Sequence, residues 1–343
     1  MPCEPLGHLS SKAGALFNRR PPLTNERKTA DLPLAVWPCA QRTSQWQRYK
    51  RYLPESNRHP GKMLPALARR AVEDYSDPGD LILDPMCGIG TTLVEASRLG
   101  RRAFGIELEP RWAQLAIGNL DHLHAEDSRA RARAHVAEGD ARELGRLLTV
   151  EGRALLEARS GVRPIASGAV NLVLTSPPYA CELADVRTEN KVRGGGPLRR
   201  PDTTNYSRDR RNLGHARGSR YLEAMAPIYR ACASVLKPGG FMVCVTKDMR
   251  SAGGGALRNL SGETIELCES AGLTYWQRVI GLLATVRDDE LVMRPSFWQT
   301  LHARRRRANG DRTQVVAHED VLVFRKPVVA VKEASPTTIR KAA

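Results

Sequence analysis

The chain has 343 residues, which is enough for one large α/β domain with insertions or for two modest domains. Its 53 Lys and Arg residues exceed its 37 Asp and Glu residues by 16, and a positive charge of this size indicates a polyanionic partner such as nucleic acid. The seven cysteines form no CxxC pair and no zinc spacing, and no stretch reaches the ~20 apolar residues of a membrane span, so a metal centre and a membrane partner are not expected.

The N-terminal segment, residues 1–56, is expected to form an arm and a lid beside the main domain. No apolar signal-peptide core follows Met1, which together with the unpaired cysteines predicts a cytoplasmic protein. Residues 1–30 contain few apolar anchors and predict a mobile arm. Aromatic residues then alternate with Arg and Lys over residues 37–52, a pattern typical of either a base-stacking surface or a lid packed on the main domain.

A glycine turn follows the first predicted strand of the main domain. The apolar run at residues 81–83 leads into Asp84-Pro85-Met86-Cys87-Gly88-Ile89-Gly90-Thr91-Thr92 and then into a helical pattern. At Gly88 and Gly90 the backbone can approach a ligand closely, because glycine carries no Cβ. The turn lacks the third glycine of the dinucleotide fingerprint, so by itself it identifies a ligand site but not the ligand.

Two acidic residues follow the next two predicted strands. Residues 102–107 predict a strand that ends in Glu107, and an acidic residue about 20 positions beyond the glycines can accept hydrogen bonds from the ribose hydroxyls of a nucleoside. Glu109 is a close competitor for this position. Residues 135–139 predict a third strand, and the Asp140 that follows it is suited to cap a helix starting at residue 141.

A second chemical motif follows the fourth predicted strand, at residues 170–174. There the sequence reads Thr175-Ser176-Pro177-Pro178-Tyr179, which places a hydroxyl, two prolines and an aromatic ring at the carboxyl end of a buried strand. In open α/β sheets, ligands bind at these carboxyl ends. The motif is therefore expected to lie beside the glycine turn.

Two basic segments are candidates for contact with phosphate groups. Residues 180–220 form a glycine-bearing basic insertion, which predicts a loop that orders on a polyanion, and residues 294–312 form a second basic loop. For both segments the alternative is a solvated surface loop. The candidate nucleic-acid contacts are Arg199, Arg200, Arg210, Arg211, Arg304, Arg305 and Arg306.

The glycine turn and the Ser-Pro-Pro-Tyr element together resemble the cofactor loop and the catalytic turn of the S-adenosylmethionine-dependent DNA amino-methyltransferases, the cytosine-N4 and adenine-N6 family. The resemblance covers residues 57–326 and implies an α/β, Rossmann-like class I methyltransferase domain. Its sheet is expected to have seven mostly parallel strands with helices on both faces. Residues 327–343 are expected to form a loose tail. Many relatives place the catalytic turn before the glycine loop, unlike this chain. No separate target-recognition segment is evident, so specificity is expected from the arm, the 180–220 insertion and the 294–312 loop.

The resemblance implies S-adenosyl-L-methionine as cofactor and assigns roles to residues that match the family's motifs. A His-Pro element lines the methionine end of the cofactor in the family, which places His59 there, and the acid after the third strand binds the adenine amino group, which is Asp140 here. The cofactor-binding residues expected in this way are His59, Asp84, Pro85, Cys87, Gly88, Gly90, Thr91, Thr92, Glu107, Asp140 and Thr175.

The chemistry of amine methylation explains the residue types of the catalytic turn, Ser176, Pro177, Pro178 and Tyr179. An exocyclic amine on a base is a poor nucleophile because its lone pair is delocalised into the ring. Acceptors at the Ser176 hydroxyl and the Pro177 carbonyl would draw the nitrogen toward tetrahedral geometry, and the prolines would fix those acceptors in place. Tyr179 offers a face for stacking a flipped base.

The resemblance favours a site-specific DNA methyltransferase acting on cytosine N4, because Ser at the first position of the turn is commoner among cytosine-N4 enzymes. Adenine-N6 methylation of DNA is an alternative. So is guanine-N2 methylation of tRNA, which Ser176 disfavours because Asn or Asp commonly opens the turn in those enzymes. A non-catalytic nucleic-acid-binding protein on the same scaffold is disfavoured because every position that the chemistry needs is filled. Cytosine-C5 chemistry is excluded, since Pro38-Cys39 lies upstream of the first predicted strand. The sequence indicates neither a recognition site, a paired restriction nuclease nor an oligomeric state.

Overall fold

The computed structural model describes residues 33–127, 134–147, 168–179, 207, 209–250, 256–295 and 297–328. The chain divides into two compact units, Met1–Leu34 and Ala35–Ala343, and the second contains the helices and strands given below. The first 32 residues, most of the 180–220 insertion and the tail after residue 328 lie outside the described residues, so the expectations for them stay predictions.

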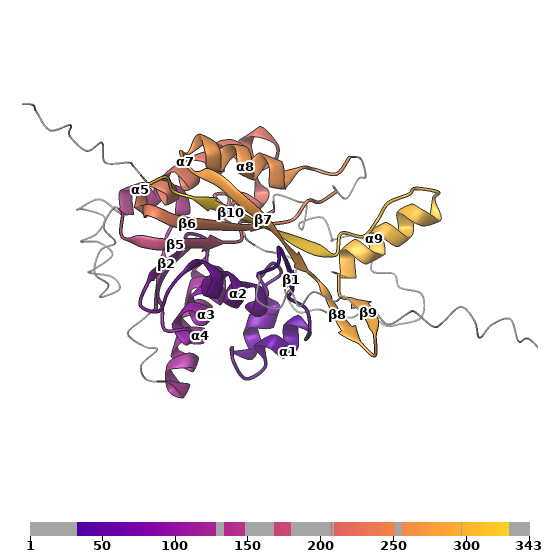
Figure 1. Cartoon of the computed structure of the whole chain (residues 1–343), viewed down its shortest axis with the longest axis horizontal. Helices are drawn as coiled ribbons and strands as arrows, with labels where there is room; N and C mark the ends of the chain where they lie inside the picture. The colour runs from indigo at the N-terminus through magenta and orange to yellow at the C-terminus, as the bar shows by residue number, and fades with distance from the viewer. Residues whose placement is uncertain are drawn as a thin grey trace, which may run out of the picture. The chain divides into compact units, whose positions relative to one another are not determined.

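An eight-stranded sheet forms the centre of the second unit (Figure 1). The strands in spatial order are β1 (Val36–Pro38), β7 (Thr274–Leu282), β10 (His318–Arg325), β6 (Leu236–Thr246), β5 (Val170–Thr175), β2 (Leu81–Asp84), β3 (Arg102–Glu107) and β4 (Ala134–Glu138). Neighbouring strands are parallel except that β10 is antiparallel to both β6 and β7. This is the mostly parallel, Rossmann-like methyltransferase topology that the sequence predicted.

The expected count of seven strands is wrong by one, because β1 pairs in parallel with the end of β7. Trp37 is buried in this short strand, whereas Val36 is exposed. Pro38 cannot donate to a ladder and is tolerated because β1 is an edge strand. A three-residue strand gives too little alternation to be recognised from sequence. The sheet therefore begins inside the segment expected to be an arm, ahead of residue 57.

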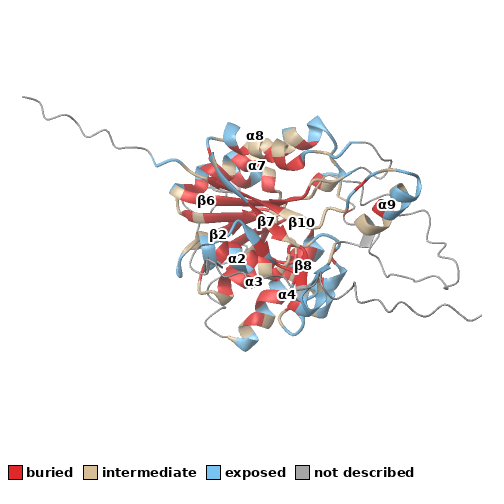
Figure 2. Ribbon diagram, turned by 45° about the vertical axis from the view of Figure 1, so that its right-hand side comes forward, coloured by how far each residue is buried: buried red, intermediate tan, exposed pale blue. Residues whose placement is uncertain are grey.

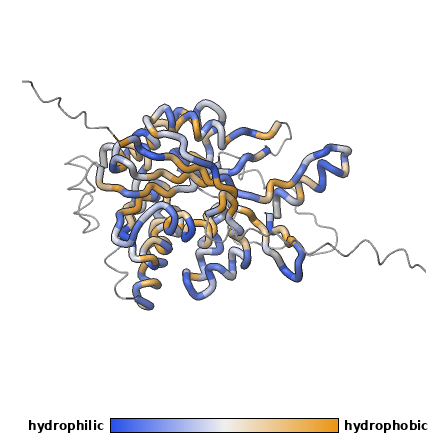
Figure 3. Tube along the Cα trace, viewed as in Figure 1, coloured by the Kyte–Doolittle hydropathy of each residue, from blue (hydrophilic) through white to orange (hydrophobic). Residues whose placement is uncertain are grey.

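Helices cover both faces of the sheet. One face carries α2 (Pro65–Tyr75), α3 (Thr91–Arg98) and α4 (Pro110–Glu126), and the other carries α5 (Leu144–Leu147), α7 (Ser219–Val235) and α8 (Leu260–Ser270) (Figure 1). Shorter elements are α1 (Ser44–Arg48), η1 (Pro54–Arg58), η3 (Ala141–Glu143) and η5 (Leu213–His215). Figure 2 shows the buried strands between these two helical layers, and Figure 3 shows the apolar residues running along the strands.

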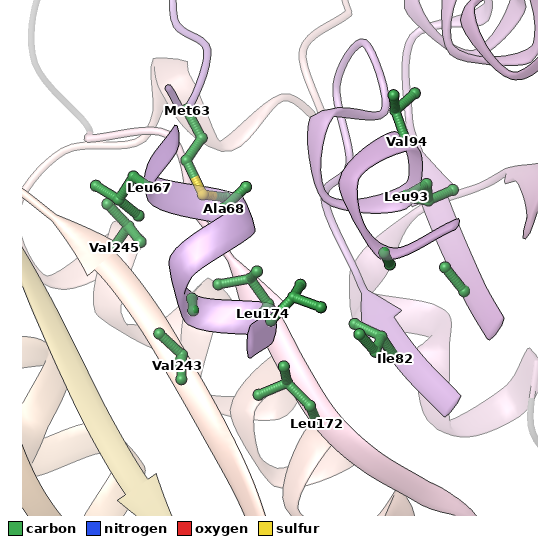
Figure 4. Close-up of a cluster of buried hydrophobic side chains, with 14 of the residues drawn as sticks. Met63, Leu67, Ala68, Ile82, Leu93, Val94, Leu172, Leu174, Val243 and Val245 are labelled. Atoms are coloured by element: carbon green, nitrogen blue, oxygen red, sulfur yellow. The ribbon is translucent and has the colours of Figure 1, made fainter. Parts of the chain in front are cut away.

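The two faces of each central strand enter two separate hydrophobic cores. On β5, Leu172 and Leu174 pack in the core under α2 and α3, while Val173 packs in the core under α7 and α8. Figure 4 shows the first core, where Leu172, Leu174, Val243 and Val245 lie against side chains of α2. Burial on both faces explains why these strands read as continuous apolar runs in the sequence.

A segment outside the central sheet connects β7 to β10. It contains the hairpin β8 (Ala284–Arg287) and β9 (Glu290–Met293), followed by α9 (Phe297–Ala308). The predicted 294–312 loop is thus largely a helix, because its residues include good helix formers and no Gly or Pro from 297 to 308. β7 ends at Leu282 and β8 begins at Ala284, so only one residue separates the sheet from the hairpin. Among the described residues, no helix is long and apolar enough to cross a membrane.

Candidate active site

A pocket lies where the parallel strands β2, β3 and β5 end. Its empty space, including the part open to solvent, is about 740 Å³. The expected site residues that line it are His59, Asp84, Pro85, Cys87, Gly88, Thr91, Thr92, Glu107, Asp140, Ser176, Pro178 and Arg211. Gly90, Thr175, Pro177 and Tyr179 do not line it. The glycine turn and the catalytic turn, separated by about 90 residues of sequence, thus open into one pocket.

The glycine turn has a backbone conformation that only glycine adopts without strain. Gly88 and Gly90 have φ angles of 54° and 79°, and Gly90 caps the N-terminus of α3. A Cβ on Gly90 would lie 3.1 Å from the Cβ of Ala116, and a Cβ on Gly88 would lie 3.4 Å from His59 Nε2. Gly90 therefore also needs glycine for space, whereas the contact at Gly88 is an ordinary van der Waals distance and its positive φ is what favours glycine there.

Asp84, the last residue of β2, holds the start of the glycine turn through hydrogen bonds. Its carboxylate accepts a hydrogen bond from the Thr92 hydroxyl at 2.7 Å and one from the Met86 N–H at 3.2 Å. Burial raises the pKa of Asp84 to about 6, although the hydrogen bonds from Thr92 and Met86 act in the opposite direction. Thr175, which ends β5, is fully buried and does not line the pocket.

Glu107 connects the end of β3 to the glycine turn. Its two carboxylate oxygens accept hydrogen bonds from the N–H groups of Gly88, at 2.8 Å, and Glu109, at 2.9 Å. Each oxygen keeps a further acceptor site that can face the pocket. Burial raises the pKa of Glu107 to about 7. The competing residue Glu109 does not line the pocket; its carboxylate is bound by Ser207 and Asn212.

His59 and Lys62 form the wall opposite the glycine turn. Burial lowers the pKa of His59 to about 3, with Lys62 acting in the same direction, so the imidazole is neutral. The His59 ring packs edge-on against Trp112, with the ring centroids 4.6 Å apart. The Lys62 ammonium donates to the carbonyl of His59 at 2.7 Å, and burial lowers its pKa to about 8.

Asp140 lines the pocket but is engaged by its neighbour. It caps η3 by accepting from the Arg142 N–H at 2.9 Å, and both its oxygens also accept from the Arg142 guanidinium. Burial alone would raise the pKa of Asp140, but the hydrogen bonds from Arg142 outweigh it and lower the pKa. Binding an adenine amino group would therefore require the Arg142 side chain to move aside.

The catalytic turn places Ser176 and Pro178 in the pocket wall. Pro177 is buried, and Tyr179 packs at the margin of the core under α7 and α8. The Tyr179 hydroxyl lies 3.3 Å from Ser176 Oγ and donates to Glu319 on β10 at 2.7 Å. Lys247, immediately after β6, pairs with the same carboxylate at 3.0 Å.

Sequence reasoning missed these two partners of the catalytic turn. Lys247 carried a usable signal, because it is the first charged residue after an apolar strand of a parallel sheet. Glu319 carried none, because β10 is antiparallel and only its pairing with β6 and β7 brings its first residues to the carboxyl edge of the parallel strands.

Asn119 on α4 is a third residue that sequence reasoning missed. Its amide donates to the carbonyl of Ile89 in the glycine turn at 2.9 Å and accepts from the N–H of Leu53 at 2.8 Å. Nearby, the Tyr52 hydroxyl donates to Glu95 on α3 at 2.7 Å. These hydrogen bonds connect the segment around residues 52–56 to α3 and, through Asn119, to the cofactor loop.

The predicted nucleic-acid contacts lie on different elements. Arg210 and Arg211 precede η5, and Arg211 lines the pocket while pairing with Asp209 at 2.6 Å. Arg304 and Arg305 are exposed on α9, whereas Arg306 pairs with Asp311 and donates to Thr313 at 3.0 Å. Arg199 and Arg200 lie outside the described residues. No cluster of His, Cys, Asp and Glu suited to a metal ion occurs within the described ranges.

Comparisons with known proteins agree with this arrangement. Residues 11–118 match the N6_N4_Mtase family, described as DNA methylase. A DNA adenine methyltransferase of Escherichia coli K12, YhdJ, is 30% identical over 122 residues, which are 34% of this chain and 38% of that protein. The type II methyltransferase M.ScaI of Streptomyces caespitosus is 34% identical over 89 residues, 26% of this chain and 28% of that protein.

An RNA-modifying enzyme is also similar. A tRNA (guanine(10)-N2)-dimethyltransferase of Methanocaldococcus jannaschii is 40% identical over 70 residues, which are 20% of this chain and 20% of that protein. The chain thus matches between 20% and 38% of the length of these three curated relatives.

Proposed function

We propose that the chain is an S-adenosylmethionine-dependent DNA amino-methyltransferase, the family that its matches support, and that it methylates an exocyclic amino group of a DNA base, cytosine N4 in preference to adenine N6. The observation that carries this proposal is the position of Ser176, whose turn opens into the same pocket as the glycine loop. Methylation of an exocyclic amine needs a hydrogen-bond acceptor for the amine beside the cofactor, and the Ser176 hydroxyl can serve as that acceptor. We assign the methyltransferase domain to residues 57–326, with β1 added at its edge.

The residues of the pocket fit S-adenosyl-L-methionine, the cofactor of this family. When bound, it supplies an electrophilic methyl group on a sulfonium centre. Glu107 would accept from the two ribose hydroxyls through the acceptor sites left by its backbone hydrogen bonds. Gly88 and Gly90 would admit the cofactor close to the backbone, and the neutral His59 would line its methionine end without repelling the sulfonium.

The catalytic turn would hold the target amine by its hydrogens. The Ser176 hydroxyl and the Pro177 carbonyl serve as acceptors, and the two prolines keep the turn from adjusting during the reaction. Tyr179 would stack on the flipped base. Ser176 at the opening of the turn supports cytosine N4 over adenine N6 and over guanine N2 of tRNA, the reactions of two of the relatives.

The net charge of +16 supports duplex DNA as the partner, and the exposed arginines of α9 are the best-placed described candidates for phosphate contact. Replacing Arg304 and Arg305 together by Gln should weaken DNA binding and reduce the slope of log K against log salt by about 1 to 2, because each phosphate neutralised by the protein contributes about 0.9 to that slope. The measurement is fluorescence anisotropy at several salt concentrations.

The matched control for the α9 variant is the replacement of Arg69 and Arg70 by Gln. These arginines are also exposed on a helix, but each already pairs with a carboxylate of α2. The control should leave the salt slope unchanged. Equal slopes for the wild type and the α9 variant would contradict the assignment of Arg304 and Arg305 to phosphate contact.

The proposed function is tested by incubating the protein with labelled S-adenosylmethionine and either duplex DNA or bulk tRNA, followed by nucleoside mass spectrometry. N4-methylcytosine from DNA is the expected product. N6-methyladenine would keep the reaction class and change the base, whereas methylguanine from tRNA alone would contradict DNA as the substrate.

We also propose a cytoplasmic location, which agrees with a DNA substrate. The five described cysteines are free thiols, as in a reducing compartment.

A further inference from the structure

A continuous series of polar side chains leads from the pocket wall to the centre of the carboxyl edge of the sheet. Ser176 Oγ lies 3.3 Å from the Tyr179 hydroxyl, and that hydroxyl lies 2.7 Å from Glu319 Oε2. Lys247 Nζ lies 3.0 Å from the other carboxylate oxygen, Glu319 Oε1. Glu319 lies on β10, Lys247 directly follows β6, and Ser176 and Tyr179 follow β5, so the pairing of these three neighbouring strands brings the four residues together.

The pair at the far end of the series is shielded from water. The Lys247 side chain is 6% exposed and the Glu319 side chain is 19% exposed. An ion pair with so little solvent access keeps its geometry, because neither partner can exchange the other for water at low cost.

The types of these groups determine the direction of the hydrogen bonds. A carboxylate can only accept and an ammonium can only donate, whereas a hydroxyl can do both. With Lys247 donating to one oxygen of Glu319, the Tyr179 hydroxyl must donate to the other. Its proton is then used, so the Tyr179 oxygen acts toward Ser176 only as an acceptor. The Ser176 hydroxyl therefore donates to Tyr179, which leaves its own lone pairs for the pocket.

We propose that Glu319, held by Lys247, is a positioning residue that sets the direction of this hydrogen-bond series, so that Ser176 presents lone pairs rather than its proton to the target amine. This inference rests on the proposed function, because it assigns an amine as the group that meets Ser176. The Glu319 bond also fixes the plane of the Tyr179 ring on which the base would stack. Neither Glu319 nor Lys247 touches the reacting atoms; both act through Tyr179.

Glu319→Gln tests the direction while conserving size. Lys247 will hold the amide oxygen, which turns the amide NH₂ toward Tyr179 and makes the Tyr179 hydroxyl donate to Ser176 instead. Ser176 would then point its proton at an amine that also offers only protons. We expect the single-turnover rate of methyl transfer to fall about 10- to 100-fold, with the affinity for S-adenosylhomocysteine unchanged.

Two double variants distinguish a reversal of the hydrogen-bond direction from a general disruption of the site. In Tyr179→Phe the series is interrupted, so adding Glu319→Gln should reduce the rate no further. In Lys247→Met with Glu319→Gln the amide is free to turn its oxygen toward Tyr179, so this double variant should transfer faster than Glu319→Gln alone. Additive losses in the first pair, or no recovery in the second with the cofactor affinity retained, would overturn the inference.

A neighbouring carboxylate provides the matched control. Asp320 is the next residue on β10 and is also buried and paired with a cation, Arg278, but it faces α8, where it accepts from Ser261 at 2.8 Å. Asp320→Asn should lower the thermal stability without the loss of rate seen in Glu319→Gln. If both variants lose rate in proportion to stability, Glu319 has only a structural role.

A readout independent of activity is the tyrosine Raman doublet, recorded as the difference between each protein and its Tyr179→Phe counterpart. Its intensity ratio reports the balance between donating and accepting by a phenol. In Glu319→Gln the 2.7 Å bond that Tyr179 donates to a carboxylate is replaced by one that it accepts from an amide, so the ratio should move away from strong-donor character. An unchanged ratio would refute the reversal of direction. Failure of the proposed function is recognised separately, because the wild-type protein would then methylate no base in DNA.

Discussion

Ser176→Ala is expected to reduce the single-turnover rate of methyl transfer by about 10²- to 10³-fold, the usual loss when one preorganised hydrogen-bonding group is removed from a reacting centre. The Ser176 side chain lines the pocket, but it makes none of the described contacts that hold the glycine turn or Glu107. The affinity for S-adenosylhomocysteine should therefore stay within about twofold of the wild type. Rapid-quench transfer of a labelled methyl group and isothermal titration calorimetry measure the two quantities.

The control for this variant is Ser270→Ala. Ser270 ends α8 and its hydroxyl donates to a backbone carbonyl of its own helix at 2.8 Å, outside the pocket lining. Its replacement should alter neither the rate nor the affinity. Full activity of Ser176→Ala would refute the role of Ser176 as an acceptor for the amine, and a large loss of cofactor affinity would move it to the cofactor site.

Glu107→Ala is expected to weaken binding of S-adenosylhomocysteine by about 10²- to 10³-fold. The change removes a charged acceptor for the ribose hydroxyls, and hydrogen bonds to charged groups contribute about 1.5–3 kcal/mol each. It also leaves the buried N–H groups of Gly88 and Glu109 without their acceptor. Calorimetry measures the affinity. Glu138→Gln is the control, because Glu138 is the register partner of Glu107 on β4 but is exposed and does not line the pocket.

The pH dependence of cofactor binding follows from the same carboxylate. Burial raises the pKa of Glu107 from 4.5 to about 7, and the nearby carboxylates of Glu109 and Asp84 act in the same direction. Affinity should therefore fall as the pH is lowered from 8 through 7, when Glu107 takes up a proton and loses charge and acceptor capacity. Glu107→Gln should abolish this dependence, and a wild-type affinity that is constant from pH 8 to 6 would contradict the assignment.

The stability of the protein without cofactor should change with pH in the opposite sense. A carboxyl group whose pKa is raised on folding favours the folded state below its unfolded pKa, and this contribution is lost as the pH rises through the folded pKa. For Glu107 the window runs from about 4.5 to about 7, and Asp84, with a pKa raised to about 6, contributes in the same direction. As the pH falls from 8 to 6, the stability should rise while the cofactor affinity falls. Unfolding of the protein by acid would instead lower both.

The motifs that lie within a few residues of one another were readable from the sequence. The glycine turn at 88–90 and the Ser-Pro-Pro-Tyr turn at 176–179 are local structures, in which the required backbone and the required side chains occur together. The mostly parallel sheet was expected from the family resemblance that these two turns carry. The edge strand β1 and the helix α9 were missed, because three residues and an arginine run carry little periodicity.

The sequence by itself determined the two turns that meet at the pocket, since each depends on local backbone chemistry and on a short range of residue types, and the resemblance that these turns carry implied the fold class. Only the tertiary structure decided which distant side chains complete the site. It separated Glu107 from Glu109, engaged Asp140 with Arg142, and brought Glu319 and Lys247 to Tyr179. For Glu319 the reason is physical: the antiparallel return of β10 beside β6 sets its contacts, and Tyr179 and Glu319 are 140 residues apart, so no local pattern reports them.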